Sequence, residues 1–356
     1  MSTPVLICDD SSVARKQMAK SLPSDWDCEI SFAANGQEAL VAIREGKGDV
    51  LFLDLNMPVM DGYETLEAIA KEDLPTMVIV VSGDIQPEAC ARVKKLGALG
   101  FIKKPIKDNE LESVLGSFGI WSKATEPTPA QTPVSNTNTL VSNSASASSP
   151  PHEASTRLDA VGKIEYRDCI QEISNVAMGQ AADLLARLLN VFVKLPIPNV
   201  NILEASELQM ALSLTQSQTY SAACQGFIAS GIAGEALLVF SDSSFTEMAR
   251  LLKYEGQLDE TIELELIMDM SSILVGACIK GIAEQLDLSF SQGHPMVLGR
   301  HVKVADLIKM NAQRWRKTLA IEITYEIENY NITCDLLLLI TEDSLDNLYK
   351  RLSYLM

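Results

Sequence analysis

Short apolar runs alternate with amphipathic segments throughout residues 1–121 of this 356-residue chain. The runs are strand-length and nearly continuous, as in strands buried on both faces of a parallel sheet, and the segments between them show helical spacing. The pattern predicts strands at 4–10, 28–34, 50–55, 76–83 and 100–105, and helices at 11–22, 36–46, 61–72 and 87–97. Repeated β–α units predict an α/β fold, a doubly wound five-stranded parallel sheet with its site at the carboxyl ends of the strands.

The pattern stops at residues 122–157, which are rich in Ser, Thr, Pro, Asn and Ala. Leu140 and Val141 are the only sizeable apolar neighbours there. Such a segment buries too little apolar surface to offset its ordering entropy, so we expect a disordered linker. The linker divides the chain into a first domain, 1–121, and a second domain, 158–356.

The second domain opens with a long amphipathic helix. Its apolar stripe is expected to comprise Ile170, Ile173, Ala177, Leu184, Leu188 and Phe192. Four further residues, Asp168, Glu172, Asn175 and Gly179, fall within roughly a sixth of the helix circumference on the opposite face. Such a polar ridge is most often a solvated face, but a glycine within it costs the helix about 1 kcal/mol relative to alanine. A partner's backbone approaching closely beside Asn175 would account for that glycine.

The spacing of this ridge recurs further along the chain. Glu265, Asp269, Ser272 and Gly276 repeat it, and prolines follow the two copies at the same distance, Pro198 and Pro295. Residues 235–252 and 335–352 also align with each other. Coincidences in the same order indicate a duplicated unit, about 165–252 and 262–352, made of a long helix, strands and a closing helix. We expect an α+β domain of two pseudo-repeated halves.

Composition narrows the class of protein. Apolar residues make up 47% of the chain, enough for packed cores, and the longest apolar runs are far shorter than a membrane span. The net charge of −18 disfavours binding to nucleic acid or acidic membranes, which requires clustered Lys and Arg. No signal peptide is visible, so we expect a cytoplasmic protein.

Cysteine and histidine usage points away from a transition-metal centre. The seven cysteines are scattered singly, without CxxC pairs, and predict reduced, mostly buried thiols rather than disulfides or zinc ligands. The three histidines, His152, His294 and His301, are isolated and are expected to be structural or solvated.

Polar residues follow the predicted strands of the first domain. Asp9 and Asp10 end the first strand, Asp54 the third, Ser82 the fourth and Lys104 the fifth. Three carboxylates in one crevice repel one another unless a cation holds them, and an all-oxygen set suits Mg²⁺. A lysine and a hydroxyl beside them suit a phosphoryl group, whose charge both stabilise.

Residues 1–121 resemble a CheY-like receiver domain of two-component systems, which has a flavodoxin-like fold. The matching segments are CDD (8–10), DLNMPVMDG (54–62), SG (82–83) and FIKKP (101–105). The resemblance implies that Asp54 is the phosphoacceptor, and that Asp10, Asp54 and the carbonyl of Asn56 ligate Mg²⁺ with Asp9 acting through water. It also implies that Ser82 and Lys104 contact the phosphoryl group, that Phe101 is the switch aromatic, and that a sensor histidine kinase is the phosphodonor.

Residues 158–356 resemble the CheC/CheX/FliY group of chemotaxis phosphatases. The resemblance is strongest in EISNVAMGQAADLLARLLN (172–190) followed by PIPNV. It implies that Asn175 orients the attacking water at a receiver's aspartyl phosphate and that Glu172 pairs with the receiver's lysine. In the second copy Asp269 is shorter than Glu and Ser272 lacks an amide, so that site is expected to be degenerate.

Three functions are compatible with this sequence. The leading one is a response regulator whose second domain dephosphorylates a phosphorylated CheY-like receiver protein, regulated by phosphorylation of Asp54. The second keeps this chemistry but acts on the chain's own receiver, in cis or across a homodimer. The third is a binding module whose helix ridge binds a partner receiver or a flagellar component without turnover. The sequence leaves open whether the chain dimerises, whether phosphorylation activates or inhibits, and whether the pathway is chemotaxis.

Overall fold

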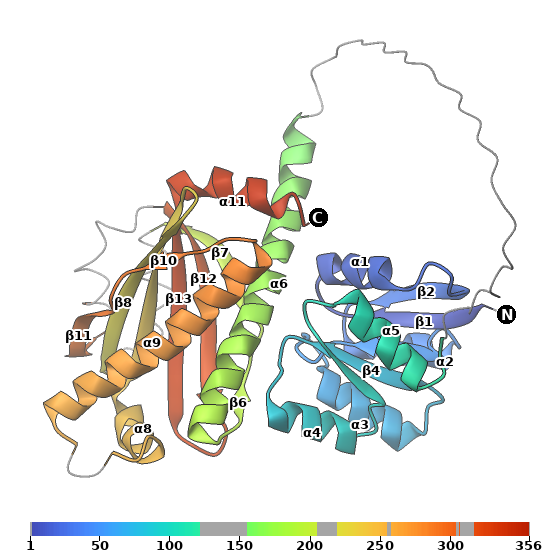
Figure 1. Ribbon diagram of the computed structural model, residues 1–356, viewed down its shortest axis with the longest axis horizontal. Helices are drawn as coiled ribbons and strands as arrows, with labels where there is room; N and C mark the ends of the chain where they lie inside the picture. Colours follow the sequence, from blue (N-terminus) through green and yellow to red (C-terminus); the bar gives the residue numbers. More distant parts are fainter. Residues whose placement is uncertain are drawn as a thin grey trace, which may run out of the picture.

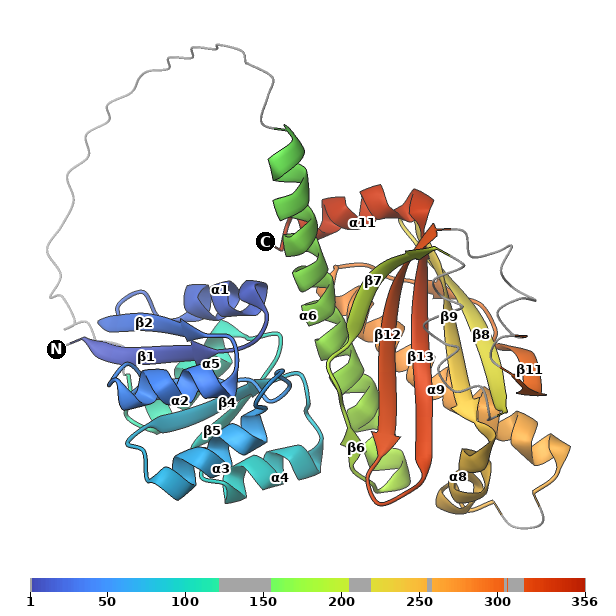
Figure 2. The same cartoon turned by 180° about the vertical axis from the view of Figure 1, so that it is seen from behind.

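A computed structural model describes residues 2–121, 155–204, 219–254, 258–303, 306 and 317–355. Most of the predicted linker, 122–154, lies outside this range. The described residues form two domains, each with its own sheet. In Figures 1 and 2 helix α6 (Ser155–Leu189) stands between them, with the first domain on one side and the sheet of the second domain on the other.

The first domain is a five-stranded parallel sheet in the order β2-β1-β3-β4-β5, flanked by helices. Its strands are β1 (Thr3–Cys8), β2 (Cys28–Ala33), β3 (Val50–Leu53), β4 (Met77–Ser82) and β5 (Gly100–Lys103). Its helices are α1 (Ser12–Ser21), α2 (Gly36–Arg44), α3 (Gly62–Glu72), α4 (Pro87–Lys95) and α5 (Asp108–Ser117). The predicted flavodoxin-like fold is confirmed, and α5 is the one helix of this domain that the pattern did not delimit.

Burial on both faces explains the continuous apolar runs of the first domain. Leu6, Leu51 and Val80 join one core cluster, whereas Val5 and Phe52 join the other. Successive side chains of a strand point to opposite faces, so both must be apolar when helices cover both. Parallel strands carry their ends to one edge, and this gathers the polar residues that follow them.

The second domain is a mixed helix and strand structure built on one antiparallel eight-stranded sheet. The path β10-β8-β9-β13-β12-β6 has β11 beside β8 and β7 beside β12. The strands are β6 (Val193–Lys194), β7 (Asn199–Glu204), β8 (Tyr220–Ala229), β9 (Ile232–Ser241), β10 (Ser291–Gln292), β11 (Met296–Val302), β12 (Lys317–Ile327) and β13 (Ile332–Thr341). Besides α6, the helices are α8 (Phe245–Leu251), α9 (Glu260–Gln285) and α11 (Leu345–Leu352).

Helices α6 and α9 pack on one face of this sheet and share its largest core cluster. A Cβ added to Gly281 of α9 would lie 2.9 Å from the Ala177 Cα, so the two helices cross at close range there. This contact fixes the position of α6 along its own axis. It thereby sets which residues on the other side of α6 face the first domain.

The element order of the second domain occurs twice. A long helix is followed by two short strands, a hairpin of two long strands, a 3₁₀ turn and a short helix, first from α6 to α8 and again from α9 to α11. The 3₁₀ turns are Asp242–Ser244 and Glu342–Ser344. This order matches the predicted repeat, while a duplication of the kind found in the CheC group stays a prediction.

Two details of α6 differ from the sequence expectation. The helix begins at Ser155, three residues inside the segment expected to be linker. The expected stripe is wrong at Leu184 and Leu188, which are 47% and 52% exposed, because Leu185 and Leu189 face the core instead. From residue 169 to 182 the helix is covered on both sides and shows almost no solvated face.

Helix α9 is long and apolar enough to cross a membrane by length and composition, with 56% of its most apolar window buried. No apolar run of that length was expected from the sequence. Leu266, Met270 and Leu274 pack into the core cluster under the sheet, which accounts for the apolar composition without a bilayer.

Candidate functional site

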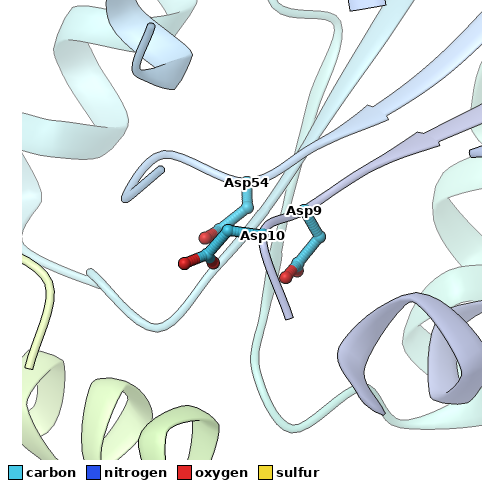
Figure 3. A group of neighbouring side chains, drawn as sticks. All are labelled: Asp9, Asp10 and Asp54. Carbon is cyan, nitrogen blue, oxygen red and sulfur yellow. The ribbon is translucent and has the colours of Figure 1, made fainter. Parts of the chain in front are cut away.

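Three aspartates meet where the first domain's strands end. Asp9 and Asp10 follow β1, and Asp54 follows β3. One carboxylate oxygen of each lies within 4.8 Å of those of the other two, and Asp54 is only 1% exposed. Figure 3 shows the Asp10 and Asp54 side chains against each other, with Asp9 beside them and α6 in pale green nearby.

Lys104, just after β5, is the cation at this cluster. Its Nζ lies 2.7 Å from the Asp9 Oδ2 and 3.4 Å from the Asp54 Oδ1. A third carboxylate comes from the second domain, because the Glu172 Oε1 of α6 lies 2.9 Å from the same Nζ. With Asp10, which lies beside Asp9 and Asp54, the cluster holds four carboxylates and one buried ammonium group.

The excess of carboxylates governs the protonation of the site. Burial, with the nearby charges of Asp9 and Glu172, raises the pKa of Asp10 to about 7. Burial also raises the pKa of Asp54, against the opposing charge of Lys104. Although burial disfavours its charged form, Lys104 has a pKa well above the usual value, because the carboxylates attract the proton. One lysine cannot neutralise the cluster.

The donor set fits a hard divalent cation. Neither carboxylate oxygen of Asp54 has a hydrogen-bond partner among the residues that the structure describes, although both are buried. Buried, unpartnered oxygens of Asp54 beside those of Asp9 and Asp10 are the ligands that Mg²⁺ takes in proteins. The chemistry of these residues therefore matches the predicted Mg²⁺ site, and the role of the Asn56 carbonyl in it stays a prediction.

The other residues predicted for the phosphoryl site lie on neighbouring strands. Ser82 is fully buried at the end of β4, and its Oγ accepts the Asp84 N–H at 3.1 Å. Phe101, on β5, is half-buried and packs against a core cluster of the sheet. Their roles as phosphoryl contact and switch stay predictions.

The ridge of α6 lies directly on this site. Besides the contact between Glu172 and Lys104, the Asn175 Oδ1 accepts a hydrogen bond from the Asn56 Nδ2 at 3.4 Å. Asn56 follows Asp54 by two residues, so Asn175 contacts the loop that carries the buried carboxylate. Glu172 and Asn175 are themselves 8% and 6% exposed. The ridge is therefore buried against protein and is not the solvated face that amphipathic helices usually present.

A cavity of about 370 Å³ adjoins the contact between the domains. Its lining comes from both domains and includes Asp54, Lys104, Glu172, Val176, Gln285 and Leu355. The volume is sufficient for several water molecules, and the charged groups on its wall supply partners for them. Water can thus reach the Asp54 side of the contact.

Comparison with known proteins identifies the first domain. Residues 5–115 match the family model described as response regulator receiver domain. This part of the chain is a receiver domain.

Among curated proteins, the chain is 41% identical over 104 residues to protein-glutamate methylesterase/protein-glutamine glutaminase 3 of Geobacter sulfurreducens, covering 29% of this chain and 28% of the relative. The chain thus spans less than a third of the length of the curated relatives it matches. Among solved structures, it is similar to CheY4 of Vibrio cholerae, with 31% identity, coverage of 33% and 98%, and a TM-score of 0.31. It is also similar to FliY of Thermotoga maritima, with 19% identity, coverage of 54% and 98%, and a TM-score of 0.40.

Two glycines allow the receiver domain to approach α6. A Cβ added to Gly179 would lie 2.0 Å from the Gly83 carbonyl oxygen, and one added to Gly83 would lie 2.9 Å from the Val176 Cα. Real Cβ atoms do not approach other atoms this closely, so both positions require glycine in this arrangement. The backbone expected to come close to Gly179 is therefore the loop after β4 of the chain's own receiver domain.

The first residue of the ridge holds the start of α1. The Asp168 Oδ2 accepts the Ser12 N–H at 2.9 Å and the Val13 N–H at 3.3 Å, and also the Ser12 hydroxyl. The first N–H groups of a helix have no partner within the helix, so this carboxylate completes α1 from the other domain. All four ridge residues thus contact the receiver domain.

The second copy of the ridge lies elsewhere and has different neighbours. The Asp269 Oδ2 accepts a hydrogen bond from the Tyr254 hydroxyl, and the Ser272 hydroxyl donates to the Met268 carbonyl of its own helix. Both residues are exposed. Within the described residues, no heavy atom comes closer than 3.9 Å to a Cβ added at Gly276. The structure brings this copy to no acid cluster in the described part of the chain.

Sequence reasoning missed two receiver residues that contact the second domain. Gln86, immediately before α4, is fully buried against Val193, and Arg92 on α4 contacts Phe192. Neither belongs to a motif, and Gln86 is marked only by the proline that follows it. Their partners lie a hundred or more residues away in the chain, so no local pattern could have shown them.

His301, which was expected to be structural or solvated, pairs with two carboxylates. Its Nδ1 lies 2.9 Å from the Asp242 Oδ2 and its Nε2 lies 3.0 Å from the Glu263 Oε2. The hydrogen bond with Asp242 raises the pKa of His301. His294 is exposed, and His152 lies outside the described residues. The seven cysteines are free thiols, and five of them are buried.

Proposed function

We propose that the second domain hydrolyses the aspartyl phosphate formed at Asp54 in the receiver domain of the same chain. The observation that carries the proposal is the 2.9 Å contact between the Glu172 Oε1 and the Lys104 Nζ. This lysine also faces the Asp54 carboxylate. A helix of one domain thus inserts an acid into the reacting site of the other, and a partner that only bound the receiver would have no need to bury that charge.

Asn175 is the residue that orients water in this proposal. Its side-chain amide offers one acceptor and two donors, enough to hold a water molecule and direct its lone pair towards phosphorus. The contact with Asn56 keeps it over the loop that follows Asp54. We take the cavity lined by Asp54 and Glu172, next to Asn175 on the helix, as the source of that water. Hydrolysis of an acyl phosphate needs mainly positioning and charge stabilisation, so no additional base is required.

The receiver domain contributes the rest of the chemistry. Asp10, Asp54 and the Asn56 carbonyl would hold Mg²⁺, with Asp9 acting through water. A bound Mg²⁺ draws charge from the transferring phosphoryl group. Lys104 and Ser82 stabilise the remaining phosphoryl oxygens, and Glu172 holds the ammonium group of Lys104 in place while the charge on phosphorus changes.

Docking of the receiver domain onto α6 limits access both to Asp54 and to the ridge of α6. Asp54 is 1% exposed beneath α6, so a sensor histidine kinase acting as phosphodonor requires the domains to separate. Glu172 and Asn175 are covered at the same time, so a separate CheY-like receiver is a substrate only of the open form. Phosphorylation of Asp54 regulates the second domain through this competition. In this proposal the circuit belongs to chemotaxis signalling.

The second domain is, in this proposal, a duplicated unit with one working ridge. The repeated order of its elements supports the duplication. The second ridge is degenerate, because Asp269 and Ser272 lack the reach of Glu and the amide of Asn, and Ser272 bonds to its own helix. The match to protein-glutamate methylesterases covers 29% of this chain, a length close to that of the receiver domain, and does not extend their activity to the second domain.

A binding module without turnover is the second candidate, and the burial of Asp54 favours it. In that case α6 would shield Asp54 from phosphodonors without acting on its phosphate. Both candidates use the same contacts, and they differ in what Asn175 does.

The two candidates are separated by the lifetime of the phosphate at Asp54. The chain is phosphorylated with a small phosphodonor and Mg²⁺, and phosphate loss is followed after removal of the donor. Hydrolysis by the second domain predicts that Asn175→Ala prolongs the lifetime on the order of tenfold or more. The matched Ser272→Ala variant on α9 keeps the wild-type lifetime. Equal lifetimes for wild type and Asn175→Ala would leave the binding module as the better account.

A further inference from the structure

The loop before α4 pairs with the edge of the second domain's sheet. The Gln86 Nε2 donates to the Val193 carbonyl at 2.7 Å, and the Val193 N–H donates to the Gln86 Oε1 at 2.8 Å. Val193 belongs to β6, which ends the sheet's strand path. One side-chain amide thus takes the place of a neighbouring strand and satisfies both backbone groups of an edge residue. Gln86 is 0% exposed.

A charged contact lies on the following turns of α4. The Arg92 guanidinium is 4.0 Å from the centre of the Phe192 ring and pairs with both oxygens of Glu328. The Glu328 N–H in turn donates to the Phe192 carbonyl at 2.9 Å, so the two partners of Arg92 are held together. The hydrogen bond with Arg92 lowers the pKa of Glu328. Cation–π and ion-pair contacts of this kind favour arginine over lysine.

Hydrogen bonds connect Gln86 with the phosphoryl site. Its N–H and its Nε2 both donate to the Asp84 Oδ1, at 3.2 and 3.0 Å. The Asp84 N–H donates to the Ser82 Oγ. Gln86 therefore anchors the loop carrying Ser82 and Gly83 onto the second domain. A carboxylate at position 86 would face the Val193 carbonyl without a donor and would add charge beside Asp84.

The contacts at the acid cluster cannot by themselves choose a substrate. Lys104 and the aspartates are groups that any receiver of the same chemistry presents to Glu172 and Asn175. Discrimination among receivers needs contacts that other receivers fail to make, or make badly. Gln86 and Arg92 make such contacts, because each has a partner in the second domain that a different side chain would leave unsatisfied.

We propose that Gln86 and Arg92 are specificity-determining residues that select this chain's own receiver domain as the substrate of α6. The proposal rests on the proposed function and adds the residues that determine which receiver is the substrate. A receiver with the acid cluster but without a glutamine before α4 and an arginine on it docks poorly and keeps its phosphate.

The test compares Gln86→Glu with Gln37→Glu, an exposed glutamine on α2, in the full-length chain. Docking is followed by hydrogen exchange at the Ser12 amide, which donates to Asp168 and lies away from Gln86. Substrate selection is followed by the phosphate lifetime at Asp54. Gln86→Glu is expected to speed Ser12 exchange and to prolong the phosphate lifetime, each about tenfold, whereas Gln37→Glu changes neither.

Arg92→Met covers the case in which Gln86→Glu fails to fold, with Lys95→Met, exposed on the same helix, as its control. Arg92→Met is expected to act in the same direction and Lys95→Met to have no effect. Unchanged Ser12 exchange in Gln86→Glu or Arg92→Met overturns the proposal, as does faster exchange with an unchanged phosphate lifetime. Asn175→Ala is measured in parallel for both Ser12 exchange and phosphate lifetime, so that an effect on hydrolysis is separated from an effect on docking. If its phosphate lifetime is that of wild type, the proposed function fails, while Ser12 exchange still decides whether Gln86 and Arg92 govern docking.

Discussion

The Asp168 carboxylate of α6 accepts the backbone N–H of Ser12 at 2.9 Å and so caps a helix of the other domain. Helix N-termini favour negative charge, and loss of a capping oxygen typically costs about 1 kcal/mol. Asp168→Ala is therefore expected to weaken docking and to speed Ser12 amide exchange roughly fivefold. Glu165→Gln on the same helix removes only an exposed pair with Lys16 and is expected to change little. Equal effects of the two variants would contradict a specific cap.

The two ridge glycines provide a matched pair of variants. Gly179→Ala places a Cβ against the Gly83 carbonyl, whereas Gly276→Ala places one at ordinary van der Waals distance, 3.9 Å from the Gln292 Oε1. Alanine favours each helix by about 1 kcal/mol, so neither change should unfold the second domain. We expect only Gly179→Ala to separate the domains, and to speed phosphorylation of Asp54 while slowing its dephosphorylation. Identical phosphorylation kinetics in the two variants would show that the domains do not dock as described.

The fold of the receiver domain was accessible from the sequence because most of its strands are nearly continuous apolar runs that end at a polar residue. The acid cluster followed from the same logic, since strands of a parallel sheet end at one edge. The ridge of α6 was also identified, because Asp168, Glu172, Asn175 and Gly179 share a face at helical spacing. These features are local or periodic patterns, which can be recognised in the sequence alone.

The surface that the α6 ridge contacts could not be predicted from such sequence patterns. A segment such as 122–157 allows contact within the chain or between chains, and only the fitted surfaces distinguish the two. The stripe failed at Leu184 and Leu188 because Leu185 and Leu189 face the core instead. Gln86 carried no signal because its importance comes from Val193, which the fold alone brings to it.

Mg²⁺ should reverse the effect of Asp10→Asn on thermal stability relative to the wild type. Asp10 is one of the four carboxylates of the acid cluster, and burial raises its pKa to about 7. Without metal, Asp10→Asn is expected to raise the thermal midpoint of unfolding, because it removes one of several carboxylates that repel one another in the folded state. Mg²⁺ at a hundred times its dissociation constant stabilises the wild type by about 2.7 kcal/mol, and Asp10→Asn should lose most of this.

Thermal midpoints with and without Mg²⁺ check this, and Asp49→Asn, at the opposite end of the sheet, serves as the control. A full Mg²⁺-dependent rise in Asp10→Asn would remove Asp10 from the metal site.

Asp84 should make stability fall with rising pH. Burial raises its pKa from 3.8 to about 6, against the hydrogen bonds from Gln86. Because the folded-state pKa exceeds the unfolded value, the contribution is complete below about pH 4 and is lost as pH rises through about 6. The loss is at most about 3 kcal/mol at pH 7. Asp84→Asn keeps the acceptor without the charge.

Thermal unfolding between pH 4 and 7 is expected to show Asp84→Asn gaining on the wild type as pH rises. A constant difference between the two across this range would mean that Asp84 does not titrate there.

The most direct test of hydrolysis within one chain is a mixing experiment. Chains with Asn175→Ala are phosphorylated at Asp54 and mixed with an excess of Asp54→Asn chains, which carry an intact ridge and no phosphoacceptor. Docking within the chain predicts that the phosphate on Asn175→Ala persists on the order of tenfold longer than in wild type, and that the intact ridges added in trans shorten its lifetime little. In wild type the loss should be first-order and independent of protein concentration. Restoration of the wild-type lifetime by the added chains, or a wild-type rate that rises with concentration, would contradict the account.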